Sequence, residues 1–240
     1  MKSIKTLALA TGLLALSGVS QAQFSSTWTV VSDYDFRGFS QSAKDPALQG
    51  SADYAFGETG FSVGAWASNV DFEPFDGDIE LDLYANYVGT INDTFAWTAG
   101  LTYYMYPGSD DVDLGVVTLP PLGEYAEGYV GLNAGGFSFK QWYSNDFYES
   151  DESAQYTEAN YTLPIGDKFS LAFHLGYSWG DYWDDAETTD YALQGNFTAG
   201  NFTIFAKFTG TEGDFEVTDD VGNNEARVLV GVSTTFPWGD

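Results

Sequence analysis

The spacing between segments of alternating polarity is the strongest constraint on how this chain folds. From about residue 28 to residue 236, short runs of alternating apolar and polar residues are separated by breaks that are in turn tight and long. The tight breaks include Gly135-Gly136 and Ala199-Gly200-Asn201, and the long ones cover residues 71–78, 107–123, 146–152, 180–188 and 212–224. A meander with tight turns on one side and long loops on the other is typical of an outer-membrane β-barrel.

The alternation predicts an all-β, antiparallel, up-and-down transmembrane barrel of about twelve strands. In residues 169–179, for example, Phe169, Leu171 and Phe173 share one face, while Ser170 and Ala172 share the other. Period two with one apolar face is the signature of a strand. The predicted strands are 28–40, 47–56, 61–70, 78–90, 95–106, 124–134, 137–146, 154–163, 169–179, 189–198, 202–211 and 225–236.

The placement of the aromatic residues separates a barrel from a soluble sandwich. Phe61, Phe95, Phe137, Phe169 and Phe202 each open a strand after a tight turn. A ring of aromatic residues at one rim is expected at a membrane interface, whereas the inner face of a sandwich collects aromatic residues at strand centres. The pattern therefore favours the barrel. The alternative is a secreted β-sandwich that binds carbohydrate or surfaces.

The first 22 residues predict a cleaved signal peptide. Lys2 and Lys5 precede an apolar stretch from Leu7 to Leu16, and small residues lead up to Ala22. That stretch is too short to span a bilayer. Residues 23–240 then form a single domain in the outer membrane of a Gram-negative bacterium, with outer-membrane lipid, lipopolysaccharide and the barrel-assembly machinery as partners. The chain has no cysteine, so a barrel would close its fold by pairing every strand edge.

The charge of the chain limits its partners. A formal net charge of −27 argues against nucleic acid, which requires a basic surface. The five long loops carry acidic residues and no basic one. They lack the spacing of an EF-hand calcium loop, which favours a solvated face over a metal site. Neither a metal nor a cofactor is expected.

Ionisable residues within the strands form the candidate functional set. A charge on the lipid face costs about 2–4 kcal/mol near the midplane, so such residues are expected to point inward. We expect Asp35 and Glu225 to neutralise Arg37 and Arg227. The candidate pore-lining residues are Asp33, Asp35, Arg37, Asp53, Glu80, Asp82, Glu127, Lys140, Glu158, His174, Lys207, Glu225 and Arg227.

Two functions fit this set. The first is a porin-like channel for passive diffusion of small hydrophilic solutes, with a preference for cations because acidic residues are in excess. Residues 107–123 form the longest loop and the best candidate for narrowing such a pore. The second is a non-conducting barrel, with a salt-bridged interior, that has a structural or adhesive role. Catalysis is not expected, because His174 is the single histidine and no Gly-x-Ser-x-Gly motif is present.

The amino-terminal motifs resemble a known family. Residues 32–42 read SDYDFRGFSQS, residues 46–50 read PALQG, and residues 80–84 read ELDLY. Together they are similar to the TorF-type porin family of proteobacterial outer-membrane proteins. The resemblance implies a channel-like barrel, with Arg37 inside against Asp35 or Glu80, and it names no permeant.

Overall fold

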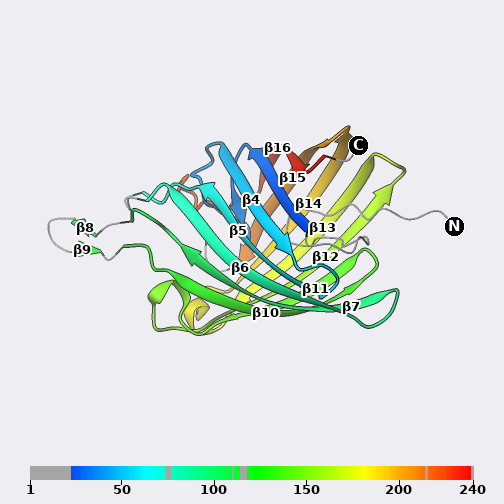
Figure 1. The fold of residues 1–240 in the computed structure, drawn as a ribbon. Helices are drawn as coiled ribbons and strands as arrows, with labels where there is room; N and C mark the ends of the chain where they lie inside the picture. Colours follow the sequence, from blue (N-terminus) through cyan, green and yellow to red (C-terminus); the bar gives the residue numbers. More distant parts are fainter. Residues whose placement is uncertain are drawn as a thin grey trace.

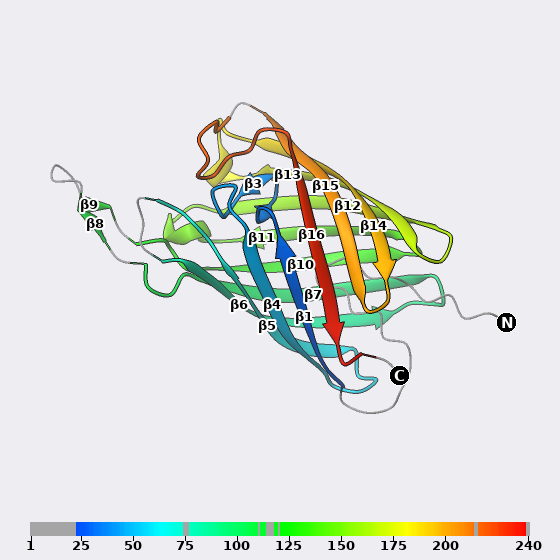
Figure 2. The same cartoon turned by 90° about the horizontal axis from the view of Figure 1, so that it is seen from above.

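The computed structural model describes residues 23–73, 77–109, 111–113, 118–119, 121–213 and 216–238. The predicted signal peptide lies outside these residues. In the described part of the chain, a closed antiparallel barrel runs in the order β1-β16-β15-β14-β13-β12-β11-β10-β7-β6-β5-β4, and β4 pairs back onto β1. Figures 1 and 2 show this barrel from two directions. The all-β barrel fold predicted from the sequence is confirmed, and the sandwich is excluded.

The barrel strands match the predicted ranges closely, with one exception. Their bounds are β1 Gln23–Val31, β4 Ala47–Ala55, β5 Phe61–Asn69, β6 Ile79–Thr90, β7 Phe95–Met105, β10 Tyr125–Ala134, β11 Phe137–Ser144, β12 Ala154–Ile165, β13 Phe169–Trp179, β14 Thr188–Ala199, β15 Phe202–Gly213 and β16 Arg227–Phe236. Two short 3-10 helices, η1 Phe147–Glu149 and η2 Asp181–Trp183, lie in loops. No helix among the described residues is long and apolar enough to cross a membrane.

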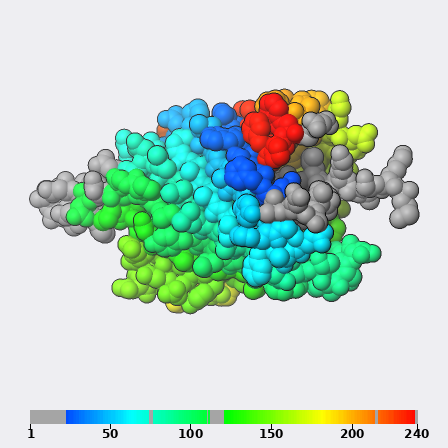
Figure 3. Space-filling model, viewed as in Figure 1, coloured from blue at the N-terminus to red at the C-terminus, as the bar shows by residue number. Residues whose placement is uncertain are grey.

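The outer surface of the barrel is apolar. Leu48, Val130 and Val228 are exposed there, at 54%, 61% and 66% of their surface. Figure 3 shows strands β4 to β7 as a continuous outer surface of packed side chains. At the rim with the tight turns, the rings of Phe61 and Tyr87 lie 4.6 Å apart. An apolar band bordered by aromatic residues is the surface that a bilayer covers.

The first strand differs from its prediction. The sequence predicts a strand over 28–40, but β1 ends at Val31, and residues 32–46 fold inside the barrel. Within this segment β2, Asp35–Phe36, pairs with β3, Phe39–Ser40, as a small hairpin. We call residues 32–46 the inner hairpin. Its alternating polarity imitates a membrane strand, because its apolar residues pack against the lumen wall where a strand would face lipid.

Residues 107–123 were the predicted pore-narrowing loop, and the described part contradicts this. Strands β8, Val112–Asp113, and β9, Thr118–Leu119, form a hairpin of their own. Figures 1 and 2 both show β8 and β9 extending away from the end of the barrel. The segment that enters the lumen is therefore the inner hairpin, which was expected to be a strand followed by a short loop.

Candidate functional site

The turn of the inner hairpin lies inside the lumen, close to the strand ends that carry the long loops. Arg37 and Gly38 connect Phe36 to Phe39 as a two-residue loop, and both have positive φ, 51° and 87°. Two left-handed residues make the turn that matches the twist of a β-hairpin. A Cβ on Gly38 would collide with Thr211 of β15 and lie 3.0 Å from Asp190 of β14. The turn is therefore seated closely against the wall.

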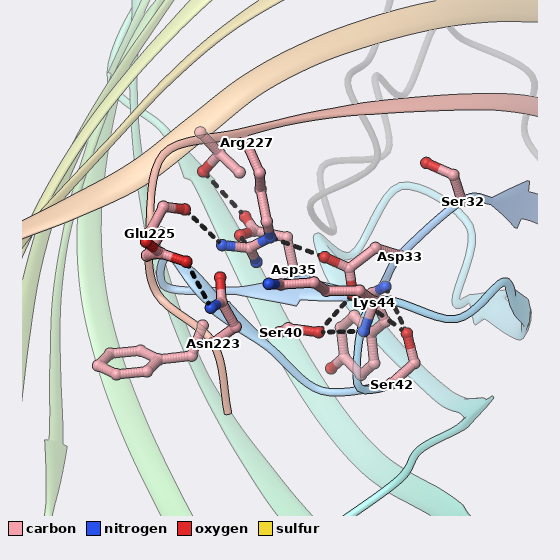
Figure 4. Close-up of polar contacts among 12 residues, drawn as sticks. Ser32, Asp33, Asp35, Ser40, Ser42, Lys44, Asn223, Glu225 and Arg227 are labelled. Carbon is pink, nitrogen blue, oxygen red and sulfur yellow. Dashed lines mark hydrogen bonds and ion pairs between the residues drawn. The ribbon is translucent and has the colours of Figure 1, made fainter. Parts of the chain in front are cut away.

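Two cationic side chains of the wall hold the hairpin through its aspartates, and Figure 4 shows one of them, Arg227. Arg227 of β16 donates from Nε to Asp33 Oδ2 at 2.7 Å and from Nη2 to Asp35 Oδ1 at 2.6 Å. Lys207 of β15 donates to Asp35 Oδ2 at 2.6 Å. The side chains of Asp33 and Asp35 are each only 4% exposed, so these ion pairs are shielded from water. Short, charge-assisted bonds of this kind are the strong class of hydrogen bond.

Arg37 reaches a different part of the wall. Its guanidinium makes a bidentate pair with Glu127 of β10, with distances of 3.0 and 2.6 Å. The group also lies 4.1 Å from the ring centroid of Tyr156 on β12. The resemblance implied Asp35 or Glu80 as the partner, and the structure assigns Glu127 instead. The Glu127 side chain is fully buried, so Arg37 is its counter-charge.

Neutral contacts complete the attachment of the hairpin. Ser40 and Ser42 donate to Asp33 Oδ1 at 2.5 and 3.2 Å, and both serines are buried. The Tyr34 hydroxyl donates to Glu80 Oε1 of β6 at 2.9 Å. The rings of Phe36 and Tyr104 of β7 lie 6.1 Å apart. Together with the ion pairs, these contacts join the hairpin to β6, β7, β10, β12, β15 and β16, so the hairpin crosses the lumen.

The wall of β4 and β6 carries carboxylates of a different kind, which we call the acidic wall: Asp53, Glu80 and Asp82. Asp53 accepts hydrogen bonds from the Tyr84 hydroxyl and, at 2.7 Å, from Ser51 Oγ. Among the described residues, no Lys, Arg or His forms an ion pair with these three carboxylates. Excess negative charge therefore lies on this side of the hairpin.

His174 belongs to a polar network on β12 to β14. Its Nε2 lies 2.7 Å from Asp190 Oδ1, and its Nδ1 lies 2.6 Å from Asn160 Oδ1. The Tyr156 hydroxyl donates to Asp190 at 3.0 Å. Asp190 is buried at 2% exposure and was not among the residues predicted to line the lumen. Asp190 is an even number of residues from Gln194 and Asn196 along β14, so the three side chains share one face of the strand. This alternation is the signal that would have placed Asp190 in the lumen.

The remaining predicted residues divide into two groups. Lys140 and Glu158 face inward across the β11–β12 pair, and the Lys140 ammonium lies 4.5 Å from the ring centroid of Tyr129. Glu225 is not where the sequence placed it. It precedes β16, is exposed, and accepts from Asn223 Nδ2 at 3.1 Å rather than forming a carboxylate pair with Arg227 (Figure 4). The partners of Arg227 are Asp33 and Asp35.

Aromatic side chains from the loops pack at the outer end of the lumen. Tyr125, at the start of β10, contacts Phe147 of η1 at a centroid distance of 4.6 Å, and Phe147 contacts Tyr182 of η2 at 4.8 Å. Burial, and then the Glu152 carboxylate, raise the pKa of Tyr182 in this loop. This cluster fixes two outer loops against the wall. Sequence reasoning missed it, because loop residues carry no strand parity.

The fold and the polar lumen define the class as an outer-membrane-type β-barrel. The chain belongs to a family described as "Bacterial protein of unknown function (Gcw_chp)", whose model matches residues 15–236. The resemblance to TorF-type porins stays a prediction beside this family. A comparison with curated proteins found no match.

Solved porin structures share the fold at low sequence identity. A KdgM porin has a TM-score of 0.54 and 12% identity, covering 88% of this chain and 99% of that one. A KdgM porin in complex with disordered oligogalacturonate has a TM-score of 0.55, 12% identity and the same coverage. A NanC porin has a TM-score of 0.56 and 10% identity, covering 89% of this chain and 98% of that one. At these identities the likeness establishes the fold alone.

Proposed function

We propose that this protein is an outer-membrane channel for passive diffusion of small hydrophilic solutes, narrowed by its inner hairpin. The observation that carries the proposal is a closed barrel with an apolar outside and a polar lumen that one ion-paired segment crosses. A channel uses such a segment to set the size and charge of what passes.

The charge of the lumen supports cations and neutral solutes as permeants. Inward carboxylates outnumber inward Lys and Arg side chains: Asp33, Asp35, Asp53, Glu80, Asp82, Glu127, Glu158 and Asp190 against Arg37, Lys140, Lys207 and Arg227. Like-charged walls repel anions and concentrate cations. One of the KdgM structures holds oligogalacturonate, an anion, and the acidic lumen argues against the same kind of solute here.

Planar-bilayer conductance of the refolded mature protein under a KCl gradient tests the proposal. We expect discrete steps of small size, with a reversal potential that favours K⁺. Replacing Arg227 by Gln removes the guanidinium that holds Asp33 and Asp35 and is expected to enlarge the steps. Deleting residues 108–119 is the matched control, and it is expected to leave the step size unchanged because β8 and β9 extend away from the barrel.

Two results would count against the proposal. Correctly folded wild-type protein and Arg227→Gln protein that both give no steps would favour the non-conducting barrel. Larger steps after the loop deletion, with no change in Arg227→Gln, would assign the constriction to residues 107–123 instead of the inner hairpin.

A further inference from the structure

Asp82 is an unusual carboxylate on the acidic wall. The residue is 8% exposed, and its Oδ1 is buried with no hydrogen-bond partner in the part of the chain that the structure describes. Its neighbours differ in this respect, because Glu80 accepts from Tyr34 and Asp53 accepts from Tyr84 and Ser51. Within the described residues, Asp82 forms no ion pair either. A buried polar oxygen without a partner is rare in folded proteins and calls for an explanation.

The surroundings of Asp82 make its charge more costly. Glu80 and Glu127 both lie within electrostatic reach of it. Arg37 brings one positive charge to these three acidic residues, and its guanidinium already forms a bidentate pair with Glu127. The carboxyl groups of Glu80 and Asp82 are thus left with no cationic partner among the described residues. Buried carboxylates in this position must gain a counter-charge or a proton.

Both strands that neighbour Asp82 carry an aromatic residue opposite it. In the strand register, Asp82 lies opposite Trp66 of β5 and opposite Tyr104 of β7, so the three side chains share the inner face. Trp66 also packs against Tyr34 of the inner hairpin, with ring centroids 5.2 Å apart. A carboxylate with an aromatic residue on each neighbouring strand suits a singly charged cation, because aromatic rings attract positive charge.

A chelated metal ion is a poor fit. No group of three or more His, Asp or Glu side chains in the described part of the chain has the arrangement to hold a metal ion. Divalent cations such as calcium require 6–8 oxygen ligands. A single carboxylate with one unpartnered oxygen, and with aromatic residues on both neighbouring strands, is suited to weak, exchangeable binding of a monovalent cation.

We propose that Asp82, flanked by Trp66 and Tyr104, forms a binding site for a monovalent cation on the acidic wall of the lumen. The site takes an alkali cation or an ammonium group, and it lies on the side of the hairpin that Tyr34 joins to the wall. This deepens the proposed function, on which its role in permeation rests. At this site a permeating cation gives up hydration water and binds the Asp82 carboxylate before it moves on through the lumen.

The first test needs no conduction. Cation binding to the folded barrel raises its melting temperature, because ligand that binds only the folded state stabilises it. Refolded wild type is heated in KCl, in tetramethylammonium chloride and in N-methylglucamine chloride at equal ionic strength. We expect the melting temperature in KCl or tetramethylammonium chloride to exceed that in the bulky N-methylglucamine salt by about 3–5 °C. The difference should vanish in Asp82→Asn and return in Asp82→Glu.

The second test measures permeation. In planar bilayers, Asp82→Asn is expected to lower the K⁺-to-Cl⁻ permeability ratio at least threefold. The matched control is Asp93→Asn, which removes the same charge from an exposed turn and is expected to leave the ratio unchanged. If Asp82→Asn does not fold, the comparison of the three salts on wild type still decides whether a cation-specific site exists.

The outcomes separate the two proposals. Stabilisation by K⁺ that depends on Asp82, in a barrel that gives no steps, would support the site and reject the channel. Conduction with equal melting temperatures in all three salts and an unchanged permeability ratio in Asp82→Asn would support the channel and overturn the site. The second result would mean that a proton neutralises Asp82.

Discussion

Carboxylates on the two sides of the inner hairpin have opposite kinds of surroundings. On the β15–β16 side, Asp33 and Asp35 are held by Arg227 and Lys207 at 2.6–2.7 Å. On the β4–β6 side, and counting the described residues alone, Asp53 and Glu80 accept hydrogen bonds from hydroxyl groups, and Asp82 Oδ1 accepts none. The first side uses carboxylates as anchors, whereas those of the second side have no cationic partner among the described residues.

Burial alone does not define the role of a charged residue. Asp33 and Asp82 are similarly buried, at 3% and 8% exposure. Removing one partner of a buried pair leaves the other charge uncompensated, which is strongly destabilising. Removing a buried charge that has no partner takes away a cost instead. The two sides should therefore respond to substitution with opposite signs.

The largest effect is expected for Arg227→Ala. This change leaves both hairpin aspartates short of a counter-charge in a position where water cannot replace it, so the free energy of unfolding should fall by about 3–5 kcal/mol. Urea unfolding in detergent, followed by tryptophan fluorescence, measures the change. Arg227→Lys keeps one positive charge and should recover part of the loss. A loss below about 1 kcal/mol would mean that the hairpin is held mainly by its neutral contacts.

A somewhat smaller effect is expected at the other anchor. Arg37→Met leaves the fully buried Glu127 unpaired and should cost about 3 kcal/mol. The double variant Arg37→Met with Glu127→Gln removes both charges and should be more stable than the single one, with a coupling free energy of about 0.5–3 kcal/mol. Additive losses would show that the two side chains do not depend on each other.

The barrel itself could be predicted from the sequence because side chains of membrane strands alternate between lipid and lumen. Alternation along residues 169–179 or 95–105 fixes which side chains face lipid, and tight turns such as Gly135-Gly136 fix where strands reverse. Inward parity likewise placed Glu127, Lys140 and Lys207 in the lumen. These features depend only on neighbours in sequence and on the cost of charge in lipid.

The inner hairpin could not be predicted in the same way. Asp33, Asp35 and Arg37 alternate with Tyr34 and Phe36, so the segment satisfies the strand rule while folding away from the sheet. Barrel closure places the last strand beside the first, and the expected proximity of Asp35 and Arg227 is confirmed. The other partners, Lys207 for Asp35 and Glu127 for Arg37, are far away in the sequence, and no local pattern names them. The one local signal was Arg37-Gly38, a two-residue turn between apolar residues.

A third pair of substitutions tests one carboxylate from each side of the hairpin. Asp33→Asn weakens bonds from Arg227, Ser40 and Ser42 and should cost about 1–3 kcal/mol of unfolding free energy. Asp82→Asn, measured without a stabilising cation, should lie within about 0.5 kcal/mol of wild type or above it. Equal losses at both positions would erase the distinction between anchoring and free carboxylates.

The smallest effect is expected at the outer edge of the same hairpin. Lys44 pairs with Asp220 at 3.1 Å, but their side chains are 36% and 72% exposed. Solvent screens such a pair, so Lys44→Ala should change the unfolding free energy by less than about 1 kcal/mol, with a difference that shrinks as salt is added. Step size in bilayers should stay at the wild-type value. If Lys44→Ala enlarged the steps as Arg227→Gln is expected to, the hairpin would be held at its exposed edge, and the buried aspartates would serve only to position it once closed.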